Sequence, residues 1–114
     1  DLAKIIAMLA ADGMYEGQQV LSPESVALME AKMDSPTILK TWQAHPMFHV
    51  PKLYGREEVL FHTGYGYGVY SCASYDNATG DGVVVVSTGA RGYKDPYDIS
   101  MISTKINEYI YSIL

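Results

Sequence analysis

Val59-Leu60-Phe61-His62-Thr63-Gly64 and the later run Val83-Val84-Val85-Val86 decide the fold of this chain. β-Branched and aromatic residues are typical of strands, and Gly66 and Gly68 after the first stretch are typical of a hairpin turn. A run that is apolar on both faces indicates a central strand with a layer on each side. The sequence therefore predicts consecutive antiparallel strands, with the polar triplet His-Thr-Gly displayed near the end of the first one.

About three strands are expected in this antiparallel meander, roughly over 59–63, 69–75 and 82–87. Residues 77–82 connect the second strand to the third, and their Asn, Asp and Gly residues tolerate the positive φ angles of a tight hairpin. The valine-rich run lies in the third strand. Every strand is thus predicted to pair with its neighbour along the chain.

Helical patterns lie on both sides of the strands. The spacing of Leu2, Ile5, Ile6 and Leu9 predicts a helix over 1–12, capped by Asp1 and ended by Gly13. A capping serine, a proline and an acid begin a second helix at 22–24, and 34–36 stop it. A third helix is predicted from Pro96 onwards. Five isoleucines form its apolar stripe: Ile99, Ile102, Ile106, Ile110 and Ile113.

These elements predict an α+β fold, because helices come first, an antiparallel meander follows and a last helix packs on the sheet. Residues 1–36 form the helix pair, and 58–114 form the sheet and the terminal helix. Between them, 37–57 has two prolines and no clear period, and is predicted to be an irregular excursion. The whole chain, 1–114, is expected to be a single domain.

Composition excludes several functional classes. A chain of 114 residues with 48% hydrophobic residues is typical of one globular domain. Its net charge of −5 and its scattered basic residues give no footprint for nucleic acid. No apolar run reaches the roughly 18 residues of a membrane span.

The glycines at 64, 66 and 68 precede a strand rather than a helix, so no phosphate loop is predicted, and no cofactor is expected.

The His62-Thr63-Gly64 triplet resembles the Lys-Thr-Gly box, with its His-Thr-Gly variant, of the serine β-lactamase and D-alanyl-D-alanine carboxypeptidase superfamily. The order of features also resembles the C-terminal portion of these penicillin-binding-protein-like hydrolases. It runs through the first helix, the entry Val20-Leu21-Ser22-Pro23-Glu24-Ser25-Val26, the triplet, the paired strands and the terminal helix. The resemblance implies a parent that hydrolyses an acyl ester, an amide or a D-alanyl peptide through a serine acyl-enzyme. It also implies a bacterial protein of the cell envelope or of another extracytoplasmic location.

The resemblance also implies roles for residues near the triplet. His62 would orient a catalytic tyrosine or donate to the substrate, Thr63 would hydrogen-bond an anionic group, and Gly64 would let the substrate approach the strand. Tyr65 and Tyr67 are the expected substrate contacts. A histidine in place of lysine removes a permanent cation, so an esterase-like or peptidase-like activity is favoured over efficient β-lactam hydrolysis. The alternative is that His62 and Thr63 are ordinary strand residues.

The rest of the family's catalytic machinery is absent from this sequence. No serine is followed by a lysine three positions later, as Ser-x-x-Lys requires. Tyr75-Asp76-Asn77 satisfies Tyr-x-Asn, but it follows the triplet instead of preceding it and is interpreted as turn chemistry. Because Asp1 already lies inside a helical pattern, the chain is predicted to be a C-terminal fragment that is inactive alone and needs the N-terminal part of the same protein.

Other readings remain open. A non-catalytic α+β module would associate through a sheet edge or a tyrosine-rich face. A cysteine–histidine enzyme built on Cys72 is a third reading, although a small buried core residue is the expectation. His45 and His49 have a metal-like spacing, but Pro46 between them prevents a helix from placing both rings on one face, so no metal site is predicted.

A partner prediction follows from the resemblance. In the parent fold, N-terminal strands pair beside the final valine-rich strand, and the present sequence does not contain them. The strand over 83–87 is therefore expected to have an unpaired apolar edge, and such an edge invites pairing with another chain. A homo-oligomer, either a dimer or a domain-swapped assembly, is predicted.

Overall fold

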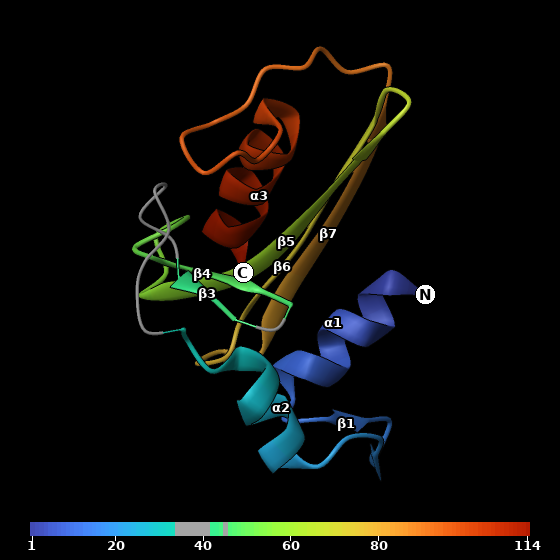
Figure 1. The fold of residues 1–114 in the computed structure, drawn as a ribbon, viewed down its shortest axis with the longest axis vertical. Helices are drawn as coiled ribbons and strands as arrows, with labels where there is room; N and C mark the ends of the chain where they lie inside the picture. Colours follow the sequence, from blue (N-terminus) through green and yellow to red (C-terminus); the bar gives the residue numbers. More distant parts are fainter. Residues whose placement is uncertain (34–41, 45) are drawn as a thin grey trace.

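The computed structural model describes residues 1–33, 42–44 and 46–114, and Figure 1 shows its arrangement. Within these residues, helices precede, interrupt and follow the strands. The elements are α1 (Leu2–Ala10), β1 (Met14–Tyr15), β2 (Gln18–Gln19), α2 (Pro23–Glu30), β3 (Trp42–Gln43), β4 (Phe48–Pro51), β5 (Glu58–Gly66), β6 (Val69–Asp76), β7 (Asp81–Thr88) and α3 (Met101–Ile113). The predicted α+β class is confirmed.

The main sheet is antiparallel, with the strand order β3-β4-β5-β6-β7. Its three long strands, β5, β6 and β7, contain the three predicted ones. Strands β5 and β6 pair from Leu60↔Tyr75 to Gly66↔Val69, and β6 and β7 pair in full. The two-residue pairing of β1 with β2 forms a separate small sheet.

The prediction of about three strands was wrong, because β3 and β4 extend the sheet. Both lie inside 37–57, which was expected to be irregular. β4 has only four residues and ends at Pro51, so its sequence is too short to show a period of two. Its order comes from pairing with β5, where Val50 lies opposite Val59. Residues 34–41 and 45, including the predicted stop of the second helix and His45, lie outside the described residues.

The two N-terminal helices differ in how their N-termini are capped. Asp1 stands at the N-cap of α1, but its side chain makes no capping hydrogen bond, so that predicted cap was wrong. Ser22 caps α2 as predicted, since its Oγ accepts a hydrogen bond of 3.2 Å from the Ser25 N–H. After α1 the chain reverses at Gly13, whose φ is +85°, and a Cβ there would lie 2.1 Å from the Leu21 carbonyl oxygen. Only glycine fits this reversal.

The sheet separates two helical layers. In Figure 1, α1 lies on one side of the long strands and α3 on the other. Because side chains alternate along a strand, Leu60 faces α1, where Ile6 and Leu9 belong to the same core cluster. Its neighbour Phe61 faces the opposite layer, in a second cluster with Ile99. In the described part of the chain, no helix is long and apolar enough to cross a membrane.

Helix α3 does not use its isoleucine stripe to cover the sheet, so that prediction was wrong for most of its members. Ile102, Ile106 and Ile113 are 42%, 39% and 63% exposed. The buried face consists mainly of small and polar residues, listed here: Ser103, Thr104, Asn107 and Tyr111. Small side chains let the helix lie close to the sheet. Hydrogen bonds compensate for only part of their burial, because Ser103 Oγ and Asn107 Oδ1 are buried without a partner among the described residues.

The buried face of α3 is held by specific polar contacts. Thr104 Oγ1 donates to Asp95 Oδ2 at 2.7 Å, and Asn107 Nδ2 lies 3.6 Å from Cys72 Sγ. The Tyr111 hydroxyl lies 3.1 Å from Ser74 Oγ on β6. These contacts join the helix to β6 and to the loop before α3, and a pattern of hydrophobic spacing cannot reveal them.

One arginine joins three distant segments at the end of the sheet where β6 turns into β7. Arg56, in the loop between β4 and β5, lies 3.0 Å from Asp81 Oδ2 and 3.7 Å from Asp76 Oδ2. Its guanidinium lies over the Tyr111 ring, 5.3 Å from the centroid, and donates to the Tyr111 carbonyl at 3.3 Å. Since only 16% of its side chain is exposed, these interactions are poorly screened by solvent.

Replacing Arg56 by alanine is therefore expected to lower the free energy of unfolding by about 2 kcal/mol, because Asp76 and Asp81 lose a shared partner in a partly buried place. Urea unfolding followed by circular dichroism measures the change. Lys52→Ala is the matched control, because its ion pair with Glu57 is exposed. Equal losses in the two variants would contradict a special role for Arg56.

A second charged cluster predicts acid sensitivity. Glu58 contacts Lys32, and its Oε2 lies 3.3 Å from Nδ1 of the buried His49, whose Nε2 donates to the Glu30 carbonyl at 2.6 Å. Partial burial raises the pKa of the Glu58 carboxyl, but the hydrogen bonds from Lys32 and His49 outweigh it, and the net pKa is lowered below 4.5.

A lowered folded-state pKa stabilises the protein above the unfolded pKa, and this stabilisation is lost as the pH falls through the folded value. When the pH is lowered from 7 to below about 4.5, the free energy of unfolding should therefore fall less for Glu58→Gln than for the unsubstituted protein. The difference should not exceed about 1 kcal/mol, since a third of the side chain is exposed. Urea midpoints at pH 7 and pH 3.5 test this, with Glu57→Gln as the control. Identical pH profiles for the two variants would contradict the prediction.

Candidate functional site

The triplet lies in the half of β5 that only β6 covers. On one side, His62 pairs with Ala73 and Gly64 pairs with Ser71. On the other side, the pairing with β4 ends at Phe48↔Phe61, one residue before the triplet. Among the described strands, none pairs with this edge of β5 from His62 to Gly66. Its outward N–H and C=O groups thus lack a strand partner among the described residues, and an unpaired edge of this kind is one to which an extended ligand can pair.

The triplet's side chains point to opposite faces of the sheet. His62 lies on the α1 side and borders a trough of about 470 Å³ between α1, α2 and the sheet. Among the described residues, the lining of the trough has no Asp, Glu, Lys or Arg side chain; it consists of Leu2, Ile5, Ile6, Leu9, Met29, Pro46, Met47, His62, Thr63, Gly64, Ser71 and Ala73. The His62 ring is exposed and lies 6.2 Å from the ring of Phe48, centroid to centroid.

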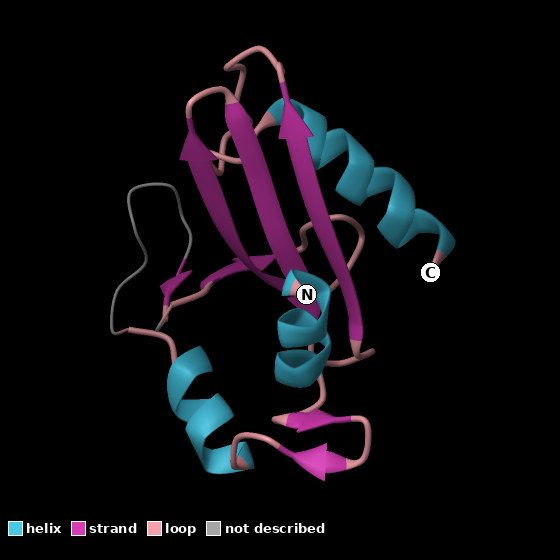
Figure 2. Ribbon diagram, turned by 90° about the vertical axis from the view of Figure 1, so that its right-hand side faces the viewer, coloured by secondary structure: helices cyan, strands magenta, loops and turns pink. Residues whose placement is uncertain are grey.

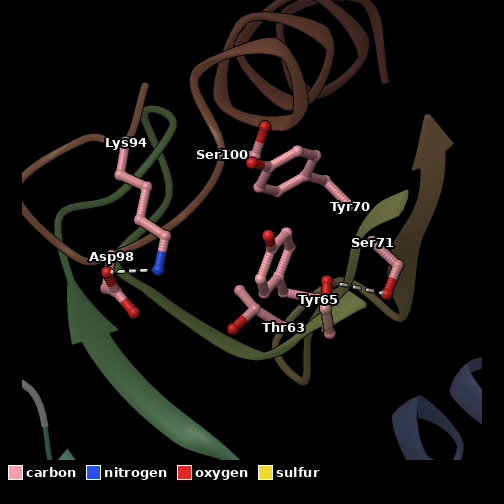
Figure 3. A pocket seen from close by; sticks show the side chains of 8 residues that line it. Thr63, Tyr65, Tyr70, Ser71, Lys94, Asp98 and Ser100 are labelled. Carbon is pink, nitrogen blue, oxygen red and sulfur yellow. Dashed lines mark hydrogen bonds and ion pairs between the residues drawn. The ribbon is translucent and has the colours of Figure 1, made fainter. Parts of the chain in front are cut away.

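Thr63 lies on the α3 side and opens onto a small polar cavity of about 20 Å³. Figure 3 shows Thr63 and Tyr65 facing this space from β5, Tyr70 from β6, and Lys94 and Ser100 from the loop before α3. Lys94 Nζ donates to Asp98 Oδ1 at 2.7 Å, and the buried Ser100 Oγ has no hydrogen-bond partner in the described part of the chain. This side of the edge therefore carries hydroxyl groups and the Lys94–Asp98 ion pair, whereas the other side is apolar.

Gly64 lies between the two spaces and packs closely against Ser71. A Cβ built on Gly64 would lie 2.6 Å from Ser71 Oγ on the paired strand. Its carbonyl accepts a long hydrogen bond of 3.5 Å from the same hydroxyl. The missing side chain keeps the strand backbone accessible from the trough, as the role expected for Gly64 requires.

The two tyrosines that were predicted to contact the substrate lie in different places. Tyr65 packs on Tyr70, with ring centroids 4.9 Å apart, and is 70% exposed beside the triplet. Tyr67 is fully exposed at the tip of the β5–β6 turn, where its φ is +50° and that of Gly68 is +79°. Tyr67 lines neither the trough nor the polar cavity. The structure thus brings Tyr65 to the triplet, but not Tyr67.

Sequence reasoning missed several residues of this site. Tyr70 and Ser71 follow from the hairpin register once the turn is placed at 67–68, so pairing rules could have found them. Lys94 and Ser100 had no local signal. They reach the site because the loop before α3 folds back, with an isolated β-bridge between them.

The Tyr75-Asp76-Asn77 segment is structural. Tyr75 is fully buried, and its hydroxyl donates to Glu30 Oε1 at 2.8 Å; burial, followed by this contact, raises its pKa well above the usual value. Asn77 Nδ2 donates to Glu30 Oε2 at 2.6 Å. Asp76 Oδ1 accepts from the Ala78 N–H in the turn. The segment ties β6 to the end of α2 and has no side chain at the triplet.

Cys72 lies in the core between β6 and α3. Its side chain is buried, and burial raises the pKa of the thiol to about 12. Among the residues that the structure describes, no three His, Cys, Asp or Glu side chains are grouped so that they could hold a metal ion.

Comparisons of the chain with protein-family models, with curated proteins and with solved structures found no match. The resemblance of the triplet to the hydrolase box therefore stays a prediction.

The state of Cys72 gives a direct test of the thiol-enzyme reading. Because the raised pKa leaves little thiolate, the folded chain should react with Ellman's reagent at pH 8 about a thousandfold more slowly than an exposed thiol. The urea-unfolded chain serves as the control and should react at the ordinary rate. Rapid reaction of the folded chain would contradict the assignment of Cys72 to the core.

Proposed function

We propose that this chain is the C-terminal portion of a β-lactamase-related serine hydrolase and forms one wall of its site through His62, Thr63 and Gly64. The parent protein would cleave an acyl ester, an amide or a D-alanyl peptide through a serine acyl-enzyme. One observation carries the proposal: the triplet lies on an open strand edge, beyond the end of β4. A strand edge of this kind can bind an extended substrate by main-chain hydrogen bonds.

The two sides of this edge suit two parts of one substrate. The trough beside His62 is apolar and uncharged, so it favours an uncharged acyl group over an anionic one. Across the strand, Thr63 Oγ1 offers a hydrogen-bond donor for a carbonyl or carboxylate oxygen, beside Lys94, whose ammonium is shared with Asp98. This division supports an esterase-like or peptidase-like reaction.

The nucleophile has to come from elsewhere in the parent protein. Ser71 is the serine that pairs with the triplet, and its Oγ contacts the Gly64 carbonyl. The lysine of a Ser-x-x-Lys pair does not follow it, because Ser74 stands three positions later. In the proposal, preceding segments of the longer protein supply the serine, its base and the tyrosine. The chain alone is inactive.

A second candidate function is a non-catalytic interaction module. Tyr67 favours it, because a fully exposed aromatic ring is held at a hairpin tip in a conformation that non-glycine residues rarely adopt. An interaction module would bind a partner through this tip or through a sheet edge, and substitutions at His62 would leave that binding unchanged.

The first experiment is to read the coding sequence upstream of Asp1 and to express the longer protein. In that protein, His62→Ala and Thr63→Val should each lower kcat/KM for a nitrophenyl ester by roughly a hundredfold, the usual cost of removing a fixed donor. Leu28→Ala is the control, since Leu28 is 73% exposed on α2, away from the triplet. Its kcat/KM should be unchanged.

Two results would contradict the proposal. The first is an upstream sequence without Ser-x-x-Lys and Tyr-x-Asn. The second is covalent labelling of the 114-residue chain by a fluorophosphonate probe, because that would require an activated serine within this chain.

A further inference from the structure

The polar cavity beside the triplet is bordered by the loop that joins β7 to α3. This loop begins next to the β5–β6 turn, because the Gly89 N–H donates to the Gly68 carbonyl at 3.2 Å. Figure 2 shows the loop and the turn at the same end of the long strands. From there the loop brings three polar residues to the cavity: Lys94, Asp98 and Ser100.

Asp95 holds this loop in one shape. Its Oδ1 accepts hydrogen bonds from the N–H groups of Tyr97 and Ile99, at 2.8 and 3.0 Å. Its Oδ2 accepts from Thr104 Oγ1 at 2.7 Å, which ties the loop to α3. The groups around the cavity are therefore fixed independently of any ligand, and this lowers the entropy cost of binding one.

The Lys94–Asp98 ion pair borders the cavity, as Figure 3 shows. Lys94 Nζ and Asp98 Oδ1 lie 2.7 Å apart, and both side chains are partly exposed. The pair offers a hydrogen-bond donor and an acceptor side by side, and its net charge is zero. A ligand group that enters the cavity thus meets a neutral pair instead of a lone cation.

The backbone of Asp98 has an unusual conformation. Its φ is +65°, in the left-handed region that Asp and Asn tolerate better than other non-glycine residues. Residues of this kind persist where surrounding contacts fix them, and they gather at functional sites. The Asp98 N–H supplies such a contact, because it donates to the Asp95 carbonyl at 3.1 Å. The loop therefore places the Asp98 carboxylate where it can neutralise Lys94.

The cavity is small as well as polar. Its volume of about 20 Å³ takes one group of the size of a water molecule. Ser100 lines it and is 5% exposed, and its Oγ has no hydrogen-bond partner in the described part of the chain. A buried hydroxyl without a partner favours a polar neighbour over an apolar one. Thr63, Gly64 and Ser71 line both the cavity and the trough, so a ligand on the β5 edge can reach both.

We infer that this cavity is a specificity subsite for one uncharged polar group of the substrate, such as an amide, and that Asp98 excludes a carboxylate from it. An amide has a donor and an acceptor, and so has the Lys94–Asp98 pair. A carboxylate would compete with Asp98 for Lys94 and would lie beside a like charge. The inference rests on the proposed function, because it concerns the substrate of the same site.

Titration of the 114-residue chain with acetamide and, separately, with acetate tests this assignment. The two probes have nearly the same shape and differ in charge. Nuclear magnetic resonance follows the backbone N–H signals of Thr63 and Lys94. Acetamide should shift these signals to saturation, whereas acetate at equal ionic strength should bind about tenfold more weakly, because it meets the Asp98 carboxylate.

Asp98→Asn is the deciding variant, since asparagine has nearly the same shape and tolerates the same φ. At low salt it should strengthen acetate binding by about fivefold, because Lys94 loses its competing carboxylate, and it should leave acetamide binding nearly unchanged. High salt should remove most of this gain. Glu108→Gln is the matched control, because it removes one charge from an exposed ion pair with Lys105 that does not line the cavity. Its acetate binding should be unchanged.

Circular dichroism verifies that the variants are folded. Equal binding of the two probes by the unsubstituted chain would overturn the inference, and so would an Asp98→Asn variant that binds acetate no more tightly. Signals that neither probe shifts would mean that the cavity takes water only, which would overturn it equally. Neither probe is cleaved, so these results do not depend on a nucleophile. The hydrolase proposal fails separately, on the upstream sequence or on the ester assay.

Discussion

The register between β5 and β6 is the constraint on which the rest of the structure depends. The two-residue turn at Tyr67 and Gly68, with positive φ at both residues, sets this register, and every pair from Leu60↔Tyr75 to Gly66↔Val69 follows from it. A slip by one residue would exchange the faces of the sheet. His62 would then point to the α3 layer, and Phe61 would leave its core cluster for the trough.

Local signals were sufficient for part of the architecture. Ser22 and Pro23 mark the start of α2 because capping acts within one helical turn, and the turn residues mark the hairpins for the same reason. β4 could not be recognised, since a four-residue segment that ends at Pro51 becomes a strand only when β5 offers a partner. The spacing of the α3 isoleucines correctly predicted a helix, but the prediction that they face the sheet was wrong. The face that packs on the sheet is polar and makes contacts with Asp95 and Cys72.

The candidate site shows the same division. His62, Thr63, Gly64 and Tyr65 are neighbours in sequence, so one strand suffices to place them at one edge. Lys94 and Ser100 arrive through a loop that folds back on the sheet, and no spacing rule relates them to the triplet. Alternation along β5 then gives the edge an apolar side and a polar side, and this asymmetry is a property of the strand rather than of any single residue.

The polar face of α3 has a consequence for motion. A helix that covers a sheet with leucine or isoleucine exposes a large apolar area to water when it detaches. On α3, Thr104 and Asn107 Nδ2 would exchange their contacts with Asp95 and Cys72 for bonds to water, and the unpartnered Ser103 Oγ would gain such bonds. The terminal helix is thus anchored by direction-dependent contacts more than by apolar area. Because much of its buried face is polar, exposing that face to water removes less apolar burial, which favours local opening of α3 while the strands stay paired.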